Sequence, residues 1–133
     1  MQKAKIQELL AKAVEAREYS YSPYSNFKVG AALITKAGKI YTGCNVENAS
    51  FGLTICAERT AIFKAISEGE REFEALAVVA DVEGVVSPCG ACRQIIHEFL
   101  RDAQIITGNI KGDYKIFTPD ELLPFPFSES AFS

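Results

Sequence analysis

Three cysteines in two short signatures place the strongest constraint on this chain. Cys56 lies in the run C-A-E-R, whereas Cys89 and Cys92 lie in the run P-C-G-A-C-R. On a helix, side chains three residues apart share a face, so the second pair can bind one ion. Zinc favours thiolate ligands, and three protein ligands leave its fourth tetrahedral position open to water, as in catalytic sites. The pattern therefore predicts one catalytic Zn²⁺.

Two residues beside Cys56 suggest how such a site would work. Glu58 can stand next to a metal-bound water and move its protons without being a ligand. Three thiolates and Zn²⁺ sum to a net charge of −1, a poor electrophile, so a cation should hydrogen-bond a ligand sulfur. We favour Arg59, three residues after Cys56, over Arg93, because Arg93 and its neighbour Cys92 point about 100° apart on a helix.

Both signatures are followed by apolar residues at helical spacing, so each is expected at the start of a helix. Pro88 suits the first position of the second helix, because its missing N–H would be unpaired there in any case. The N-terminus of a helix carries partial positive charge, which favours ionised thiolates.

Two other interpretations fit part of the pattern. C-x-x-C also occurs in redox-active dithiols, but Cys56, Glu58 and P-C-x-x-C together resemble the signature of zinc deaminases, with Cys56 in place of a histidine. A structural zinc would need a fourth ligand, for which Cys44 and His97 are the remaining candidates. We expect His97 on the polar, solvated side of its helix.

Composition indicates a globular protein. The chain has 133 residues, of which 48% are hydrophobic and 23% charged, so residues 1–133 are expected to form a single domain. No apolar run approaches the ~20 residues that a membrane span needs, and the first residues lack a signal-peptide pattern. Assigning three of the four cysteines to metal leaves no disulfide framework. These features favour the reducing cytoplasm.

The charge distribution restricts the substrate. The net charge is −3, and the dispersed Lys and Arg residues form no basic stripe of the kind that follows a phosphate backbone. Polynucleotides are therefore disfavoured, and the sequence has no glycine-rich phosphate loop. A small nucleoside fits better, although charge by itself leaves a nucleotide open.

Hydrophobic periodicity predicts an α/β fold, a three-layer αβα sandwich around a mixed sheet of about five strands. The expected helices cover residues 6–14, 55–67 and 88–100, with a final helical turn at 119–123. The expected strands cover residues 27–35, 39–46, 75–80, 104–107 and 114–118. The first two strands should form a hairpin, an irregular loop should follow at 47–53, and strands linked by helices should form parallel pairs.

The sequence resembles the small, homotetrameric type of cytidine deaminase over nearly its whole length. The resemblance is carried by S-P-Y-S at 22–25, F-K-V-G-A-A at 27–32, N-V-E-N-A at 45–49, both cysteine signatures and E-L-L-P at 121–124. It implies one Zn²⁺ per chain on Cys56, Cys89 and Cys92, a role in pyrimidine salvage, and a homotetramer whose sites are shared between subunits.

The resemblance also implies roles for individual residues. Glu58 would be the proton shuttle, while Asn45 and Glu47 would bind the ribose hydroxyl. Phe27 would lie against the pyrimidine, and Ala57 would donate its backbone N–H to the base carbonyl. From the residues alone, Phe27 could equally be a core residue, Asn45 a turn residue and Glu47 a solvated loop charge.

This chain departs from the family at two places. Phe51 stands where relatives often have tyrosine, so a hydroxyl contact near the substrate or a neighbouring subunit is lost. The tail reads L-P-F-P-F-S from 123 to 128, where relatives usually have small residues before a single phenylalanine that reaches the adjacent subunit's site. Phe127 is our choice for that residue, and Phe125 is the alternative.

The expected reaction is hydrolytic deamination of cytidine and 2′-deoxycytidine to uridine and 2′-deoxyuridine with release of ammonia. Zinc-bound hydroxide would attack C4 while Glu58 transfers the protons. One alternative is deamination of another cytosine-bearing small molecule such as blasticidin S. Another is a zinc-stabilised binding module without activity.

Overall fold

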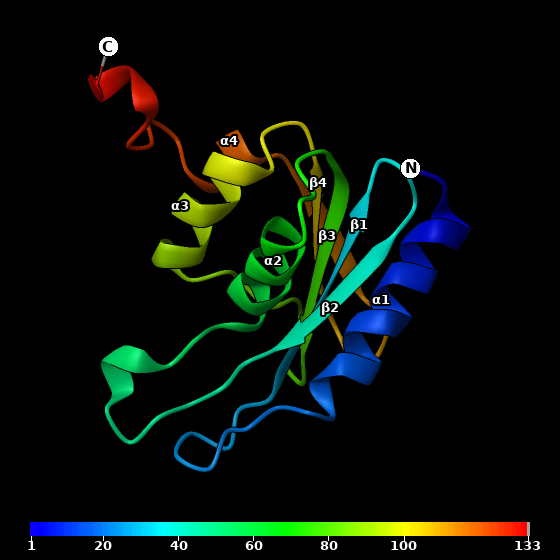
Figure 1. The fold of residues 1–133 in the computed structure, drawn as a ribbon. Helices are drawn as coiled ribbons and strands as arrows, with labels where there is room; N and C mark the ends of the chain where they lie inside the picture. Colours follow the sequence, from blue (N-terminus) through cyan, green and yellow to red (C-terminus); the bar gives the residue numbers. More distant parts are fainter. Residues whose placement is uncertain (133) are drawn as a thin grey trace.

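A five-stranded sheet in the order β2-β1-β3-β4-β5 forms the middle layer of the computed structural model, which describes residues 1–132. The strands are β1 (Val29–Thr35), β2 (Ile40–Cys44), β3 (Phe73–Ala80), β4 (Gln104–Asn109) and β5 (Tyr114–Phe117). Helix α1 (Lys3–Arg17) covers one face, and α2 (Ala57–Ser67) and α3 (Gly90–Phe99) cover the other (Figure 1). The expected three-layer αβα sandwich around a mixed sheet is confirmed.

Alternation along the central strands supplies both cores, because successive side chains point to opposite faces. One core packs Ile6, Leu9, Leu10 and Ala13 of α1 against Ala32, Ile34, Ala75, Ala77, Val79 and Ile106. The other packs α2 and α3 against the second face and includes Ala31, Leu33, Ala61, Ile62, Leu76, Ile96, Leu100 and Ile105. These two cores fix the helices that begin at the cysteine signatures.

The expectation of parallel strand pairs is correct only for β3 and β4. Strand β1 runs antiparallel to both β2 and β3, and β5 runs antiparallel to β4. The connection through α2 does make β2 and β3 run in the same direction, but β1 lies between them in the sheet. The helix therefore crosses over a strand, and the two parallel strands are not neighbours.

Helices α2 and α3 each begin one residue after a cysteine of the two signatures, and α3 begins later than expected. Cys56 is the N-cap of α2, and Cys89 is the N-cap of α3, which begins at Gly90. The prediction that Pro88 is the first helical residue is therefore wrong. The Sγ of Cys89 accepts a hydrogen bond from the backbone N–H of Cys92 at 3.4 Å, so this sulfur caps the helix and Pro88 precedes the cap.

The expectation of a solvated His97 is also wrong. Its side chain is buried, with 9% of the residue exposed, and Nε2 lies 3.1 Å from Oδ1 of Asp120. Asp120 belongs to a short helix α4 (Pro119–Leu122), which lies beside α3 in Figure 1. The hydrophobic period of α3 predicts that the face with His97 is exposed to solvent. In the structure this face is covered by α4, which follows β5.

Two short 3-10 helices complete the described chain, η1 (Phe51–Leu53) and η2 (Glu129–Phe132). The first interrupts the loop expected to be irregular, and the second ends a tail that extends away from the α/β body in Figure 1. Among residues 1–132, no helix combines the length and hydropathy that crossing a bilayer requires.

Candidate metal and substrate site

The sulfurs of Cys56, Cys89 and Cys92 meet where the N-termini of α2 and α3 converge. All three lie within 4.8 Å of one another, and those of Cys56 and Cys89 are 3.7 Å apart. Two sulfurs bound to one tetrahedral zinc at the usual bond length are roughly 3.8 Å apart. The cluster therefore fits one Zn²⁺ held by three cysteines.

Hydrogen bonds within the cluster prepare Cys56 to act as a ligand. Hydrogen bonds from the thiol of Cys92, from Arg59 and from Cys89 lower the pKa of Cys56 to about 5. Donation to Cys56, together with burial, raises the pKa of Cys92. Cys56 is thus a thiolate at neutral pH, and thiolates are the form that binds zinc.

The two arginines near the cluster have different contacts. Nη2 of Arg59 donates to Sγ of Cys56 at 3.3 Å. The guanidinium of Arg93 instead donates to the carbonyl oxygens of Pro88 and Leu122 at 2.9 and 2.7 Å and to Ser87 Oγ at 2.6 Å. The structure therefore places Arg59 against a ligand sulfur, whereas Arg93 ties the segment before Cys89 to α4.

Glu58 is a buried carboxyl group at the edge of the cluster. It lies in the first turn of α2 and is 4% exposed. Burial, followed by the negative charge of Cys56, raises the pKa of Glu58 to about 7. A carboxyl group with such a pKa can both accept and donate a proton near neutral pH, which suits a general acid and base.

A cavity of about 270 Å³ opens beside Glu58. It brings together residues from the loop before β1, the segment after β2, the start of α2 and the segment before α3: Ser25, Phe27, Val29, Asn45, Glu47, Phe51, Thr54, Ile55, Cys56, Ala57, Glu58, Val86, Ser87 and Cys89. Of these lining residues, those with charged side chains at neutral pH are carboxylates and the Cys56 thiolate. The cavity thus offers a small polar molecule an apolar wall and a few directed polar groups.

Asn45 holds the start of β1 and Phe27, which lies two residues before this strand. The residue is 8% exposed, and its Oδ1 accepts the backbone N–H of Val29 at 3.0 Å and the hydroxyl of Ser20. Its Nδ2 donates to the carbonyl oxygen of Phe27 at 2.7 Å. An amide NH₂ has two donors, so one N–H of Asn45 is left over from its contacts within residues 1–132.

Glu47 organises the loop before Phe27. It is 5% exposed, and its Oε1 accepts the backbone N–H groups of Tyr24 and Ser25 at 3.0 and 3.1 Å. The hydroxyl of Ser25 donates to Oε2. These bonds, the Ser25 hydroxyl above all, lower the pKa of Glu47. Glu47 is therefore a buried, ionised acceptor rather than a solvated loop charge.

Comparison with known proteins identifies the family to which this site belongs. Residues 3–108 match the family model described as the cytidine and deoxycytidylate deaminase zinc-binding region. The chain belongs to the cytidine deaminase family. The matched range contains all three cysteines of the cluster, so zinc is the metal that the cluster binds in this family.

Individual members of the family match most of the chain. A cytidine deaminase from Sporosarcina psychrophila is 54% identical over 129 residues, covering 96% of this chain and 95% of that protein. A crystal structure of cytidine deaminase from Burkholderia pseudomallei has a TM-score of 0.89 and 48% identity, covering 96% of this chain and 100% of that one. A blasticidin-S deaminase from Bacillus cereus is 33% identical over 110 residues, which cover 77% of this chain and 78% of that protein.

Most residues expected at a cytidine deaminase site line the same cavity: Phe27, Asn45, Glu47, Cys56, Ala57, Glu58 and Cys89. Sequence reasoning missed Ser25, Val86 and Ser87, which also line it. Ser25 belongs to the quoted motif S-P-Y-S but received no role. Val86 and Ser87 directly precede P-C-x-x-C, and that proximity is the one signal that could have found them.

Phe127, also expected to contact substrate, lies in the C-terminal tail and outside the cavity lining of its own chain. Its carbonyl oxygen accepts a hydrogen bond from Nε2 of Gln94 at 2.7 Å, and its ring packs edge-on against Phe132 with centroids 5.8 Å apart. Phe125 is fully exposed and has a positive φ of 54°. The tail therefore presents phenylalanine rings to the outside of the molecule.

Proposed function

We propose that this protein hydrolyses cytidine and 2′-deoxycytidine to uridine and 2′-deoxyuridine with release of ammonia, in pyrimidine salvage. The observation that carries the proposal is the buried carboxyl of Glu58, which lies beside a three-cysteine cluster in a cavity of about 270 Å³. The names of the related proteins, which are cytidine deaminases, support cytidine as a substrate.

Cys56, Cys89 and Cys92 would hold the zinc ion, and Arg59 would offset the excess negative charge through its hydrogen bond to Cys56. When bound, zinc supplies Lewis-acid activation of a water molecule by lowering the pKa of that water. The backbone of the α2 N-terminus fixes Cys56 and Glu58 two residues apart, so the carboxyl stays at the edge of the metal site.

Glu58 would carry out the proton transfers. It accepts a proton from the water that adds to C4 of cytosine and delivers this proton to N3. It then transfers the remaining hydroxyl proton to the 4-amino group, which leaves as ammonia while the C4 carbonyl forms. The near-neutral pKa of Glu58 suits each acceptance and donation.

The unused polar groups of Asn45 and Glu47 suit one sugar hydroxyl. Asn45 has one N–H left to donate, and Oε2 of Glu47 has a lone pair left to accept, once their contacts within residues 1–132 are counted. A hydroxyl accepts one hydrogen bond and donates one. A substrate that lacks it would leave both buried groups unpaired, which costs about 1–3 kcal/mol for each group.

Two further residues would bind the base. The ring of Phe27 is partly exposed and lines the cavity, so it can pack against a pyrimidine. Ala57 is the first residue of α2, where a backbone N–H has no partner within the helix and can donate to the base carbonyl.

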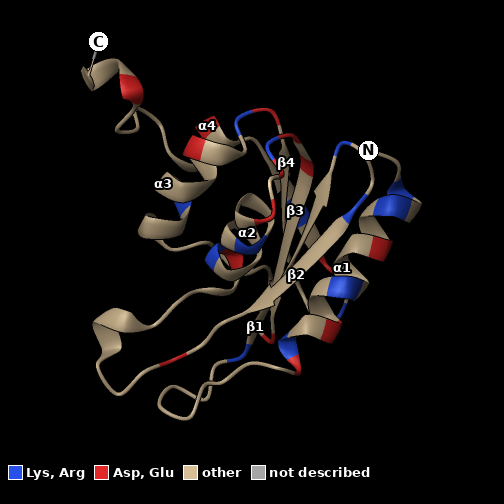
Figure 2. Ribbon diagram, in the orientation of Figure 1, with Lys and Arg blue, Asp and Glu red and all other residues tan. Residues whose placement is uncertain are grey.

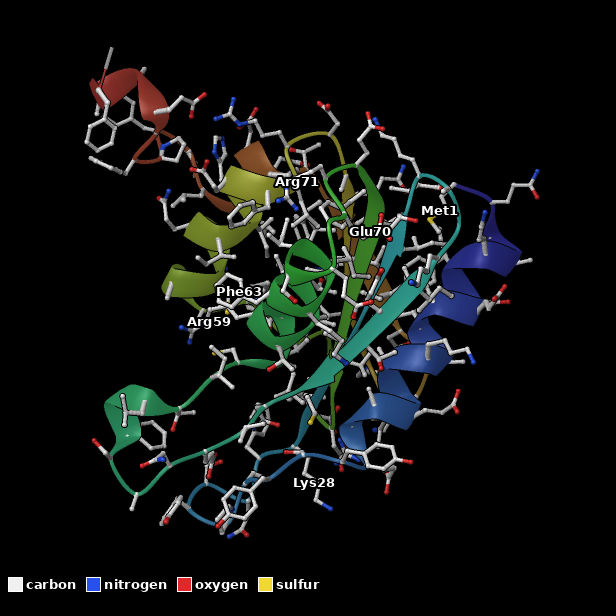
Figure 3. All side chains as sticks on the ribbon, in the orientation of Figure 1. Met1, Lys28, Arg59, Phe63, Glu70 and Arg71 are labelled. Carbon is white, nitrogen blue, oxygen red and sulfur yellow. The ribbon has the colours of Figure 1, made fainter. Side chains whose placement is uncertain are left out.

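The charges around the cavity favour a nucleoside over a nucleotide. The lining includes Glu47 and Glu58, and neither lysine nor arginine is among the described lining residues. Lys28, next to Phe27 in sequence, points outward at the lower edge of Figure 3. Figure 2 shows Lys and Arg residues distributed over several elements and mixed with acidic residues on α1. A phosphate would therefore face repulsion here, and a polynucleotide would find no continuous basic surface.

A second candidate substrate is blasticidin S, favoured by the 33% identity to the Bacillus cereus enzyme. The two candidates separate in a comparison of cytidine, 2′-deoxycytidine, free cytosine and blasticidin S as substrates. We expect the two nucleosides to react much faster than the others, because they offer hydroxyls to Asn45 and Glu47. Preferential turnover of blasticidin S would reverse the assignment.

We also propose that residues 1–133 form one domain and act in the cytoplasm as a homotetramer whose subunits share their sites. Exposed Phe125, Phe127 and Phe132 in the tail support an interface with another copy. If Phe127 reaches the neighbouring site, F127A raises KM for cytidine more than F125A does. Sedimentation of both variants and of the parent protein tests the oligomeric state separately.

The function is tested by measuring zinc per chain together with the ultraviolet absorbance change on conversion of cytidine. We expect one zinc per chain and turnover that is lost in E58Q, by roughly 10²-fold or more, with zinc and the folded state retained. E8Q, which removes an exposed carboxyl of α1, serves as the matched control. An active protein without zinc would refute the proposal, and zinc without turnover would favour a zinc-stabilised binding module.

A further inference from the structure

We propose that Ser25 is a positioning residue that fixes Glu47 and Phe27 relative to each other, so that the sugar and the base are bound in register. This inference rests on the proposed cytidine deaminase function. Ser25 lines the cavity but lies outside the metal cluster. Its role follows from the two hydrogen bonds of a single hydroxyl group.

The first bond joins Ser25 to the sugar side of the site. Its Oγ donates to Oε2 of Glu47, while the backbone N–H groups of Ser25 and Tyr24 occupy Oε1. The carboxylate is therefore held by donors at both oxygens, and its rotation is blocked. The Ser25 hydroxyl occupies one lone pair of Oε2, and this bond fixes the direction of the second lone pair, which remains free for the substrate.

The second bond joins Ser25 to the base side. Its Oγ accepts the backbone N–H of Phe27 at 3.1 Å, and Nδ2 of Asn45 donates to the carbonyl oxygen of the same residue at 2.7 Å. Phe27 is thus held at both backbone groups by residues of the sugar side. The ring that faces the base takes its position from the Ser25 hydroxyl as well as from Asn45.

The local backbone explains why this hydroxyl is needed. Residues 23–28 are exposed, and Asn26 has a positive φ of 58°. The turn is closed by the N–H of Asn26, which donates to the carbonyl oxygen of Ser22 at 2.9 Å. An exposed turn gains little from apolar packing, so its geometry depends on hydrogen bonds. Ser25 supplies the bonds that link this turn to both proposed substrate contacts.

The test compares S25A with the parent protein, using cytidine and 2′,3′-dideoxycytidine, which lacks both ring hydroxyls. We expect S25A to raise KM for cytidine roughly ten-fold and to change kcat by less than about two-fold, because ground-state positioning is lost while the proton transfers are not. The increase should be smaller with 2′,3′-dideoxycytidine, which makes no use of Glu47. S25T keeps the hydroxyl and should restore most of the affinity.

S67A is the matched control, since the hydroxyl of Ser67 donates to the carbonyl oxygen of Lys64 within the last turn of α2. Zinc content and the thermal midpoint of each variant are measured alongside. The inference is overturned if KM for cytidine is unchanged in S25A, or if KM rises equally for both nucleosides. It is also overturned if S25T behaves like S25A.

The parent protein separates this inference from the proposed function. If the zinc-loaded parent does not deaminate cytidine, the proposed function fails whatever S25A does. A readout that does not need turnover is the titration of the Glu47 carboxyl by carbon NMR. We expect its pKa to be higher in S25A than in the parent, because the Ser25 hydroxyl is the main cause of the lowered value. An unchanged pKa would show that Ser25 does not hold Glu47.

Discussion

Nη2 of Arg59 donates a hydrogen bond to Sγ of Cys56 across 3.3 Å, one helical turn along α2. Figure 3 shows Arg59 projecting from α2 on the side away from the sheet. The bond places a positive charge on a cluster that would otherwise carry one negative charge in excess. The same contact raises the pKa of Arg59, so the guanidinium stays protonated. We therefore expect the electrophilic character of the metal site to depend on Arg59, which is not a ligand.

R59Q should lower kcat for cytidine by roughly 10- to 100-fold while the cluster still binds zinc, because residues that hydrogen-bond metal ligands contribute on this scale. Steady-state kinetics and metal analysis on the same preparation measure both quantities. R71Q is the control, because Arg71 donates to the backbone carbonyl oxygens of Ile66 and Glu70. These lie at and beyond the C-terminal end of α2, whereas the cluster lies at its N-terminal end. Full activity in zinc-loaded R59Q would refute the charge argument.

N45A should destabilise the protein as well as weaken substrate binding. Asn45 satisfies the N–H of Val29 and the carbonyl oxygen of Phe27, and both lose their partner in the variant. We expect the free energy of unfolding to fall by about 2 kcal/mol, measured by urea denaturation. N48A is the comparison, because Asn48 is exposed and its Oδ1 accepts the N–H of Ser50, two residues away in the same loop. Equal losses in both variants would contradict a special role for Asn45.

G43A should disturb the site from a distance. A methyl group on Gly43 of β2 would lie 2.6 Å from the backbone nitrogen of Ala61 and 2.8 Å from the carbonyl oxygen of Ala57. Helix α2 must move away, at a cost of about 1–3 kcal/mol, and it carries Glu58 with it. The midpoint of thermal denaturation and kcat should both decrease. G52A meets no atom within 4 Å, and its stability should stay within about 0.5 kcal/mol of the parent.

Acid should destabilise the loop before Phe27 through Glu47. Its pKa in the folded protein is lowered below the ordinary value of 4.5, mainly by the Ser25 hydroxyl. The stabilisation is therefore fully present above pH 4.5 and is lost as pH falls through the lower folded pKa. The thermal midpoint should decline in that acid range, and E47Q should decline less steeply. Parallel acid limbs for the two proteins would show that Glu47 does not contribute.

Residue spacing determined the parts of the site that lie within one element. The separation of Cys89 and Cys92 puts both at one helix end, and the spacing from Cys56 to Arg59 gives their hydrogen bond. Helix and strand positions followed from apolar periods of the same local kind. Strand ends do not follow from these periods: the sequence predicts the second strand at 39–46, whereas β2 covers Ile40–Cys44. Such boundaries depend on neighbouring strands.

Pairing between distant segments was decided only in three dimensions. His97 looks solvated within its helix, yet α4 covers it and Asp120 contacts it. Ser25 lies in a turn that has no period, and its link to Glu47 spans 22 residues of sequence. Strand β1 lies between β2 and β3, which no pattern in either strand encodes. A hydrophobic period in the sequence indicates which side of one helix or strand is buried. It does not indicate which other element packs against that side, because this choice depends on the free energy of the whole fold.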